Sequence, residues 1–343
     1  MSAQPIAIAA TGMVTGVGLS ASASCAAIRA GIDNFQETRF KDVAGEFIQG
    51  CEVQLERPWQ GVTKLSKMLA RAIAEACAEL DLNPDGLPVL VCLAEKERPG
   101  WESSHASKVF FQVQEELGIR FNRGSALIQH GRIGGLVALQ QAQRLLYESD
   151  SDVVLVAGVD SLLSGNMVKN LERNDRVLTS LNSDGFVPGE GASALAVKRP
   201  LPGGDSQLVC RGLGFGVEWA TIDSHEPLRG DGLVSAVTSA LSAAERSMDD
   251  MSFRIVDVSG EHYWFKEAAL VLARLLRRNT ENAPLWHVAD CVGEVGSAVV
   301  GVSLSYVKSA FEKNFAPGFH MLVHGGNDNG QRGAAVFEFM EHS

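Results

Sequence analysis

The chain has 343 residues, which is too long for one small core and fits one large domain or two fused halves. Hydrophobic residues make up 45% and charged residues 21%, a balance that is typical of a globular protein and excludes a disordered one. The formal net charge of −11 argues against nucleic acid as the main partner, because phosphate binding requires clustered Lys and Arg; an acidic carrier protein would need only one local basic patch.

The first two hundred residues alternate between strands and helices. Strands are predicted at 6–10, 87–94, 125–129, 153–158 and 192–197, and helices at 21–30, at 64–80 and from the glycine-rich turn after 125–129 to about residue 146. The run 87–94 is apolar throughout, which is expected of a central strand with both faces covered.

The remaining residues repeat this order. Strands are predicted at 208–216, 253–258, 286–289, 321–324 and 334–339, and helices at 233–246, 266–278 and 296–311. This alternation predicts an α/β protein with a largely parallel sheet. The Pro/Gly stretch Pro200–Ser206 is the predicted linker, so we expect an N-terminal half at 1–200, a C-terminal half at 207–343 and a site between them.

The six cysteines are scattered and form neither a CxxC pair nor a short metal-binding spacing, so we expect no metal site. Several lie in apolar runs, which indicates reduced thiols in a cytoplasmic protein. The N-terminus lacks the basic region of a signal peptide, and no run is long and apolar enough to span a bilayer. No glycine-rich segment has the spacing of a dinucleotide fingerprint, and we expect no cofactor.

Three segments carry a resemblance to a known family. They are the opening strand and turn IAIAATGMVTGVG at 6–18, the turn Gly135–Leu139 before a long helix, and the segment Asn182–Ala192 with the specific run DGFVPGEGA. With them the chain resembles the β-ketoacyl-acyl-carrier-protein synthases over nearly its whole length. The resemblance implies a thiolase fold, in which two duplicated α/β halves form a layered α-β-α-β-α core.

The resemblance implies a cysteine nucleophile at the start of the helix after strand 125–129, where free N–H groups stabilise a thiolate. The matching position carries Arg132, and no cysteine occurs between Cys92 and Cys210. The family also uses two histidines. The first corresponds to Glu261, or to His262 if the alignment slips by one residue, and the second corresponds to Glu294.

An Arg-Glu-Glu set cannot perform the family's condensation. Arg132 has no accessible lone pair and stays charged, and ionised carboxylates cannot donate hydrogen bonds to an oxyanion. We expect Arg132 to lie between Glu261 and Glu294 in a buried ion cluster; the alternative is that one or both glutamates are exposed. His130, His262 and His287 offer another set for acid–base chemistry, although each is more often a satisfied histidine of the core or cleft.

The final glycine-rich stretch 325–333 is similar to the family's last loop, but its phenylalanine is missing, which weakens an acyl-binding role. Four aromatic residues either line an acyl channel or fill the core: Trp101, Trp264, Phe265 and Trp286.

These observations leave three functions open, because the fold alone cannot separate them. The favoured hypothesis is a non-condensing synthase-like subunit that binds an acyl carrier protein or a partner protein. The second is an active 3-oxoacyl-acyl-carrier-protein synthase or acyltransferase of fatty-acid or polyketide-like metabolism with a non-standard site. The third is a hydrolase or ligand-binding protein that uses His130 and the glutamates. The resemblance also implies a homodimer through strand 125–129, or a heterodimer with an active synthase.

Overall fold

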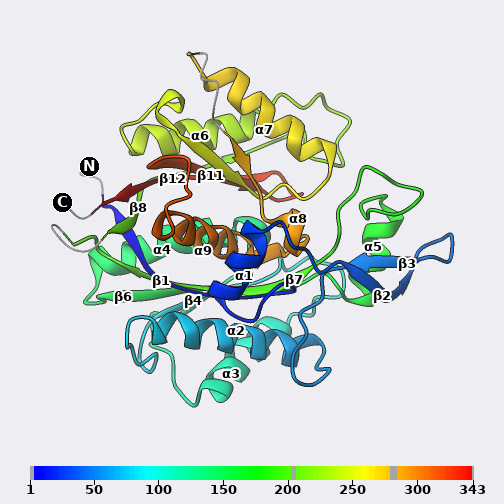
Figure 1. The fold of residues 1–343 in the computed structure, drawn as a ribbon, viewed down its shortest axis with the longest axis horizontal. Coiled ribbons are helices and arrows are strands. Elements are labelled where there is room, and N and C mark those ends of the chain that lie inside the picture. Colours follow the sequence, from blue (N-terminus) through cyan, green and yellow to red (C-terminus); the bar gives the residue numbers. More distant parts are fainter. Residues whose placement is uncertain (1–3, 202–205, 279–283, 342–343) are drawn as a thin grey trace.

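The computed structural model describes residues 4–201, 206–278 and 284–341. Ten strands form one sheet in the order β10-β9-β11-β12-β8-β1-β7-β6-β4-β5 (Figure 1). The N-terminal strands of this sheet are β1 (Ile6–Thr15), β4 (Val89–Cys92), β5 (Ala126–Ile128), β6 (Val153–Ser161) and β7 (Glu190–Lys198). Their helices are α1 (Ala21–Arg29), α2 (Gly61–Ala78), α3 (His105–Leu117), α4 (Gly134–Glu148) and α5 (Gly165–Arg173). A separate hairpin joins β2 (Gln36–Lys41) to β3 (Phe47–Gly50).

The C-terminal part supplies a second set in matching order. Its strands are β8 (Gln207–Val217), β9 (Phe253–Val256), β10 (Leu285–Trp286), β11 (His320–Gly326) and β12 (Gln331–Met340). Its helices are α6 (Asp231–Ala243), α7 (His262–Leu275), α8 (Ala289–Val292) and α9 (Val299–Glu312). The order β8-β12-β11-β9-β10 therefore matches β1-β7-β6-β4-β5, and the two sets meet where β1 pairs with β8.

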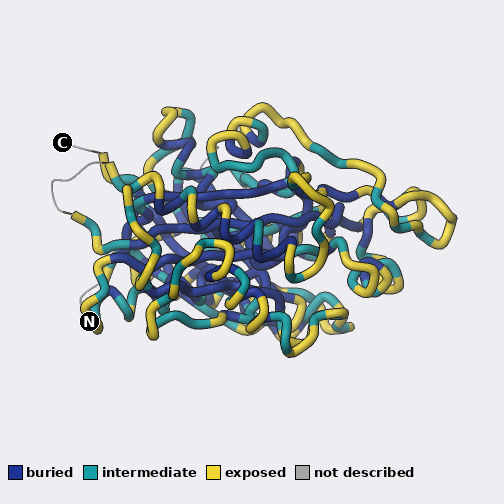
Figure 2. Tube along the Cα trace, turned by 90° about the horizontal axis from the view of Figure 1, so that it is seen from below, coloured by how far each residue is buried: buried dark blue, intermediate teal, exposed yellow. Residues whose placement is uncertain are grey.

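The molecule is built in layers. Helices α2 and α3 cover one outer face, α6 and α7 cover the other, and α4 and α9 lie between the two sets of strands (Figure 1). The middle layer packs buried Leu139 of α4 and Val302 of α9 against strands from both sets. Figure 2 shows the buried segments running through the interior with the exposed ones around them. The predicted thiolase-type layering is confirmed.

The prediction of a largely parallel sheet is wrong. In the described part of the main sheet, five strand pairs are antiparallel and four are parallel. The reason is that β7 returns beside β6 without a covering crossover, and β12 follows β11 through the short turn 327–330. A tight turn joins antiparallel strands, whereas parallel strands need a longer crossover.

Several other expectations need correction or lie outside the described residues. Helix α7 begins at His262, four residues before the prediction, and strand 87–94 is shortened to Val89–Cys92. The hairpin β2–β3 and helices α3 and α5 were not predicted. Residues 202–205 of the predicted linker lie outside the described residues. No helix in the described ranges has the length and apolar character needed to cross a membrane.

Candidate functional site

The start of α4 places Arg132 in the interior. Strand β5 leads through a single 3-10 turn, Gly131–Ile133, directly into the helix. Gly131 has φ +49°, a left-handed conformation that favours glycine, and a Cβ at this position would displace the carboxylate of Glu95, 2.2 Å away. Gly135 packs against Val300 of α9 with no room for a side chain. Because these glycines have no side chains, the start of α4 can pack closely against its neighbours inside the protein. Arg132 at this position is only 7% exposed.

Arg132 lies among three carboxylates from three different segments. Its Nη2 is 2.9 Å from Oδ1 of Asp328, its Nη1 is 3.6 Å from Oε2 of Glu294, and its Nε is 3.8 Å from Oδ2 of Asp257. Its guanidinium also lies 4.1 Å from the ring centre of Trp264. Burial opposes the charged form, but these carboxylates outweigh it and raise the pKa of Arg132 above its usual value. The side chain is a permanent cation.

Glu294 is fixed by the segment that carried the strongest resemblance. Its backbone N–H donates to the carbonyl of Val187 and its carbonyl accepts from the N–H of Gly189, both at 2.9 Å. Its Oε1 accepts from the N–H of Gly296 at 2.9 Å. Burial raises the pKa of Glu294 to about 7, although Arg132 acts in the opposite direction. The run DGFVPGEGA thus holds a buried carboxyl beside Arg132.

Glu261 is buried as well, but it pairs with another arginine. It precedes α7 and binds Arg176 through both carboxylate oxygens, and it accepts a hydrogen bond of 3.0 Å from Nε1 of Trp264. Nη1 of Arg176 also lies 3.1 Å from Oδ2 of Asp328. The expected ion cluster therefore contains both glutamates, and both are buried. Both carboxylates act on the charge of Arg132, but Glu261 pairs directly with Arg176, and Arg176 and Asp328 are further members of the cluster that the sequence did not predict.

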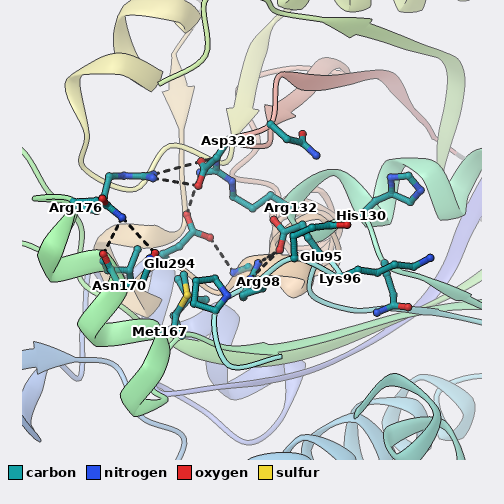
Figure 3. Close-up of a pocket in the computed structure, with 18 of the residues that line it drawn as sticks. Glu95, Lys96, Arg98, His130, Arg132, Met167, Asn170, Arg176, Glu294 and Asp328 are labelled. Atoms are coloured by element: carbon teal, nitrogen blue, oxygen red, sulfur yellow. Dashed lines mark hydrogen bonds and ion pairs between the residues drawn. The ribbon is translucent and has the colours of Figure 1, made fainter. Parts of the chain in front are cut away.

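Asp328 joins the two arginines. It lies in the turn between β11 and β12, within the glycine-rich stretch 325–333, and contacts both Arg132 and Arg176 (Figure 3). Its side chain is 49% exposed; partial burial opposes its ionisation, but the two guanidinium groups hold the pKa of Asp328 below its usual value. The neighbouring Asn327 donates to the carbonyl of His130 at 2.8 Å and so ties this turn to the start of α4.

The three candidate histidines lie in different places. His130 lines the same cavity as Arg132, and its Nδ1 is 3.2 Å from Oε1 of Gln331. His262 is exposed at the start of α7, where its backbone N–H donates to Asp184, and its side chain does not line that cavity. His287 follows β10 and contacts Asp290. The structure therefore brings only His130 of this group to the candidate site.

A cavity of about 590 Å³ opens beside Arg132 (Figure 3). Charged side chains line one part of it, including Glu95 and Arg98 from the loop after β4. Arg98 is paired with Glu95 and lies 2.7 Å from Oδ2 of Asp160. An apolar wall is formed by Pro99, Leu162, Met167, Leu171 and Phe186. Sequence reasoning missed Glu95 and Arg98, although the charged run EKER directly follows a buried strand, where ligand sites of α/β sheets lie.

No thiol is available for nucleophilic chemistry at this cavity. All six cysteines are buried and free, and none lines it. Cys92 packs near Gly134 at the start of α4, but burial raises the pKa of its thiol to about 12. Within the described ranges, no three His, Cys, Asp or Glu side chains are arranged to hold a metal ion.

Of the four aromatic candidates, Trp264 alone contacts the ion cluster. The Arg332 guanidinium also lies against its ring, 4.9 Å from the ring centre. Trp286 packs in the core against Phe253, and Trp101 packs against His105. Core filling therefore accounts for Trp286, and Trp264 forms an apolar surface for two arginines.

Comparisons with known proteins agree with this architecture. Residues 134–201 match the β-ketoacyl synthase N-terminal domain. A mycocerosic acid synthase-like polyketide synthase of Mycobacterium tuberculosis is 33% identical over 137 residues, which cover 37% of this chain and 6% of that protein.

Solved structures extend the similarity to nearly the whole chain. A type II polyketide synthase ketosynthase in complex with its acyl-carrier protein superposes with a TM-score of 0.80 at 15% identity, covering 98% of this chain and 100% of that one. The ishigamide ketosynthase/chain length factor superposes with a TM-score of 0.78 at 13% identity, covering 98% of this chain and 99% of that one. A β-ketoacyl synthase from Burkholderia phymatum superposes with a TM-score of 0.74 at 14% identity, covering 98% of this chain and 99% of that one.

The fold is therefore the thiolase fold that ketosynthases and chain length factors share. At these sequence identities the solved structures show the fold alone, and the match to the β-ketoacyl synthase N-terminal domain covers residues 134–201.

Proposed function

We propose that this chain is a non-condensing ketosynthase-like subunit that binds an acyl carrier protein or a partner subunit. The observation that carries the proposal is Arg132 at the start of α4, where the resemblance implies the nucleophilic cysteine. A guanidinium with three carboxylate neighbours cannot attack a thioester. The two positions that correspond to histidines hold buried carboxyls, which do not supply an oxyanion hole when ionised.

Helix α5 offers a carrier protein a route of approach to the cavity. Helix α5 lines the cavity with Met167, Asn170 and Leu171, and the same helix carries the exposed cations Lys169 and Arg173. On a chain with a net charge of −11, these two exposed cations would provide a local attraction for an acidic carrier. One similar structure is a ketosynthase with its acyl-carrier protein, and another is a ketosynthase in complex with its chain length factor. The free thiols favour a cytoplasmic location for this assembly.

The test is incubation with malonyl- and acyl-loaded carrier protein, followed by intact-protein mass spectrometry and measurement of carbon dioxide release. We expect no acyl adduct on the chain and no carbon dioxide above the rate without protein. Carrier binding is measured in parallel by surface plasmon resonance. The double substitution Lys169→Glu and Arg173→Glu is expected to weaken that binding at least tenfold, and Arg278→Glu, at an exposed site on another part of the chain, serves as the control. A covalent acyl-enzyme would contradict the proposal.

A further inference from the structure

Trp219 is the one tryptophan of this chain whose side chain is open to solvent. It lies just after β8 and is 83% exposed, whereas the other four tryptophans, all within the described residues, are buried or half-buried. Val217, two residues earlier, is 52% exposed. Exposed apolar side chains that lie together mark binding surfaces, and tryptophan is among the residues that contribute most to protein–protein binding. This segment is therefore a candidate contact surface.

The backbone around Trp219 is held on both sides. The N–H of buried Glu218 donates to the carbonyl of Gly330 at 2.8 Å, and the Glu218 carboxylate accepts from the N–H of Ala220 at 3.1 Å. The hydroxyl of Tyr263 donates to the carbonyl of Ala220 at 2.6 Å. The exposed ring thus stands on a fixed backbone, which reduces the conformational entropy that a partner must remove on binding.

Side chains alternate between the two faces of β8. Gly216 lies against the backbone of α6, with no room for a Cβ, and Phe215 packs on the other face with the middle layer. Val217 continues the series of Phe215. The order exposed, buried, exposed at Val217, Glu218 and Trp219 then extends the alternation beyond the end of the strand. The apolar series of β8 therefore changes from buried to exposed where the strand ends.

This exposed end of β8 borders the cavity beside Arg132. Val217 pairs with Gln331 of β12, and Gln331 lines the cavity. Oε1 of Gln331 lies 3.2 Å from Nδ1 of His130, which lines the cavity as well. Helix α5 lines the same cavity from another segment of the chain. A protein that covers the cavity opening can therefore meet both the apolar end of β8 and the cations of α5.

We propose that Trp219 is a docking contact for the acyl carrier protein, which packs its surface against Trp219 and Val217 while it stands at the cavity. This inference rests on the proposed function, because a carrier has to lie at the opening to deliver its arm. Lys169 and Arg173 of α5 attract an acidic carrier, and Trp219 adds apolar contact area. Salt screens attraction between exposed charges but does not weaken the burial of apolar surface, so the two contributions can be separated.

Surface plasmon resonance with immobilised acyl carrier protein compares the unaltered chain with Trp219→Ala at low and at high salt. We expect Trp219→Ala to weaken binding about tenfold or more at both salt concentrations, because the lost contact is apolar. The effect of the double substitution on α5 should instead shrink at high salt. Phe111→Ala removes an exposed aromatic side chain from α3, in the opposite outer layer, and should leave the affinity unchanged.

Tryptophan fluorescence gives a second readout. Acrylamide should quench the exposed Trp219 in the free chain, and a saturating amount of carrier protein should protect it. Trp219→Phe keeps an aromatic ring but leaves only the four shielded tryptophans, so the carrier should no longer change the quenching.

The outcomes separate the two proposals. Carrier binding that Trp219→Ala leaves unchanged would overturn the docking inference and leave the carrier-binding function intact. Loss of a dimer in Trp219→Ala, measured by sedimentation velocity, would assign the residue to a contact between copies of this chain and also overturn the inference. Failure of the unaltered chain to bind the carrier would overturn both. If Trp219→Ala does not fold, protection from acrylamide in the unaltered protein still decides the matter.

Discussion

Arg132 draws its partners from three segments that are far apart in the chain. Asp257 follows β9, Glu294 follows α8 and Asp328 lies in the turn after β11. The guanidinium therefore links the C-terminal strands to the start of α4. Its removal would leave three carboxylates close together, with Arg98, Arg176 and Arg332 as more distant or already paired cations.

We predict that Arg132→Met lowers the free energy of unfolding by about 3–5 kcal/mol, because breaking a buried ion pair leaves uncompensated buried charge. Urea denaturation at pH 7 measures the change. Arg71→Met is the control: Arg71 pairs with Glu56 on the surface, and we expect a loss within about 0.5 kcal/mol. A loss below about 1 kcal/mol for Arg132→Met would show that the cluster does not depend on its cation.

Glu294 should make stability depend on pH. Burial raises its pKa to about 7 in the folded protein, from 4.5 for the free group. The folded state therefore binds the proton of Glu294 more tightly than the unfolded state does. The stability gained from this protonation is fully present below pH 4.5 and is lost as the pH rises through 7. The shift corresponds to roughly 3 kcal/mol, since each pKa unit is worth about 1.4 kcal/mol.

The measurement is urea denaturation of the unaltered protein and of Glu294→Gln at pH 5, 6, 7 and 8. Glutamine does not titrate, so we expect the unaltered protein to lose stability relative to the variant across this range. Glu267, whose pKa burial also raises to about 7, titrates in both proteins and cancels in the difference. Parallel pH profiles would show that Glu294 is ionised throughout.

The sequence allowed part of this cluster to be predicted. Arg132, Glu261 and Glu294 stand at the positions where the family resemblance implies the catalytic residues, so the resemblance identified them. Asp257 and Asp328 could not be found in this way, because their approach to Arg132 depends on the pairing of β9 with β11 and on the turn before β12. Arg176 was not predicted for the same reason: only tertiary contacts bring its segment of the chain to the site.

Among the elements, β5 has a special place because it ends the sheet. It pairs with β4, and no other described strand pairs with it. Leu127 on this strand is exposed. An unpaired strand edge with an apolar side chain is prone to pair with another chain, which agrees with the dimer that the family resemblance implies.

We predict that the chain is a homodimer through β5 and that Leu127→Arg makes it monomeric, because two cations would face each other across the interface. Sedimentation velocity gives the oligomeric state. Leu181→Arg places the same charge at an exposed leucine outside β5 and should leave the dimer intact. A monomer before any substitution would contradict the prediction, and a dimer that survives Leu127→Arg would move the interface elsewhere.

The elements that sequence reasoning found are those with strong apolar periodicity, such as α2 and β6. Those it missed are more polar: β2 reads QETRFK and is largely exposed, and α5 reads GNMVKNLER with two fully buried residues. The direction of the strands was also predicted wrongly, because an apolar run does not reveal whether the neighbouring strand is parallel or antiparallel. The β11–β12 hairpin was the exception, since two strands flank a glycine-rich turn that could have indicated it.

For the molecule as a whole, every cysteine is buried, whether it lies on a strand, on a helix or in a connection. Burial raises the pKa of the thiols of Cys25 and Cys77 to about 11 and those of Cys51, Cys92 and Cys210 to about 12, and it raises that of Cys291 as well. A thiol must ionise to react, so the folded protein should be inert toward alkylation.

We predict that the folded protein takes up less than one equivalent of iodoacetamide at pH 8 within minutes, whereas the urea-unfolded protein takes up six, the number of its cysteines. Mass spectrometry counts the adducts, and glutathione labelled in the same tube controls for reagent activity. Rapid labelling of a single cysteine in the folded state would reveal a reactive thiol and count against a non-condensing site.

The overall order of the chain was predictable because each half repeats one series of strands and helices. The matching strand orders agree with duplicated halves. The division into 1–200 and 207–343 stays a prediction.

The ring of carboxylates around Arg132 also bears on how this protein can change over generations. We expect that a cysteine placed at position 132 by itself would sit among Asp257, Glu294 and Asp328, whose negative charge disfavours a thiolate. A reactive thiol at this position would thus require replacement of the surrounding carboxylates as well as of Arg132. A single substitution would not produce a working nucleophile at the start of α4.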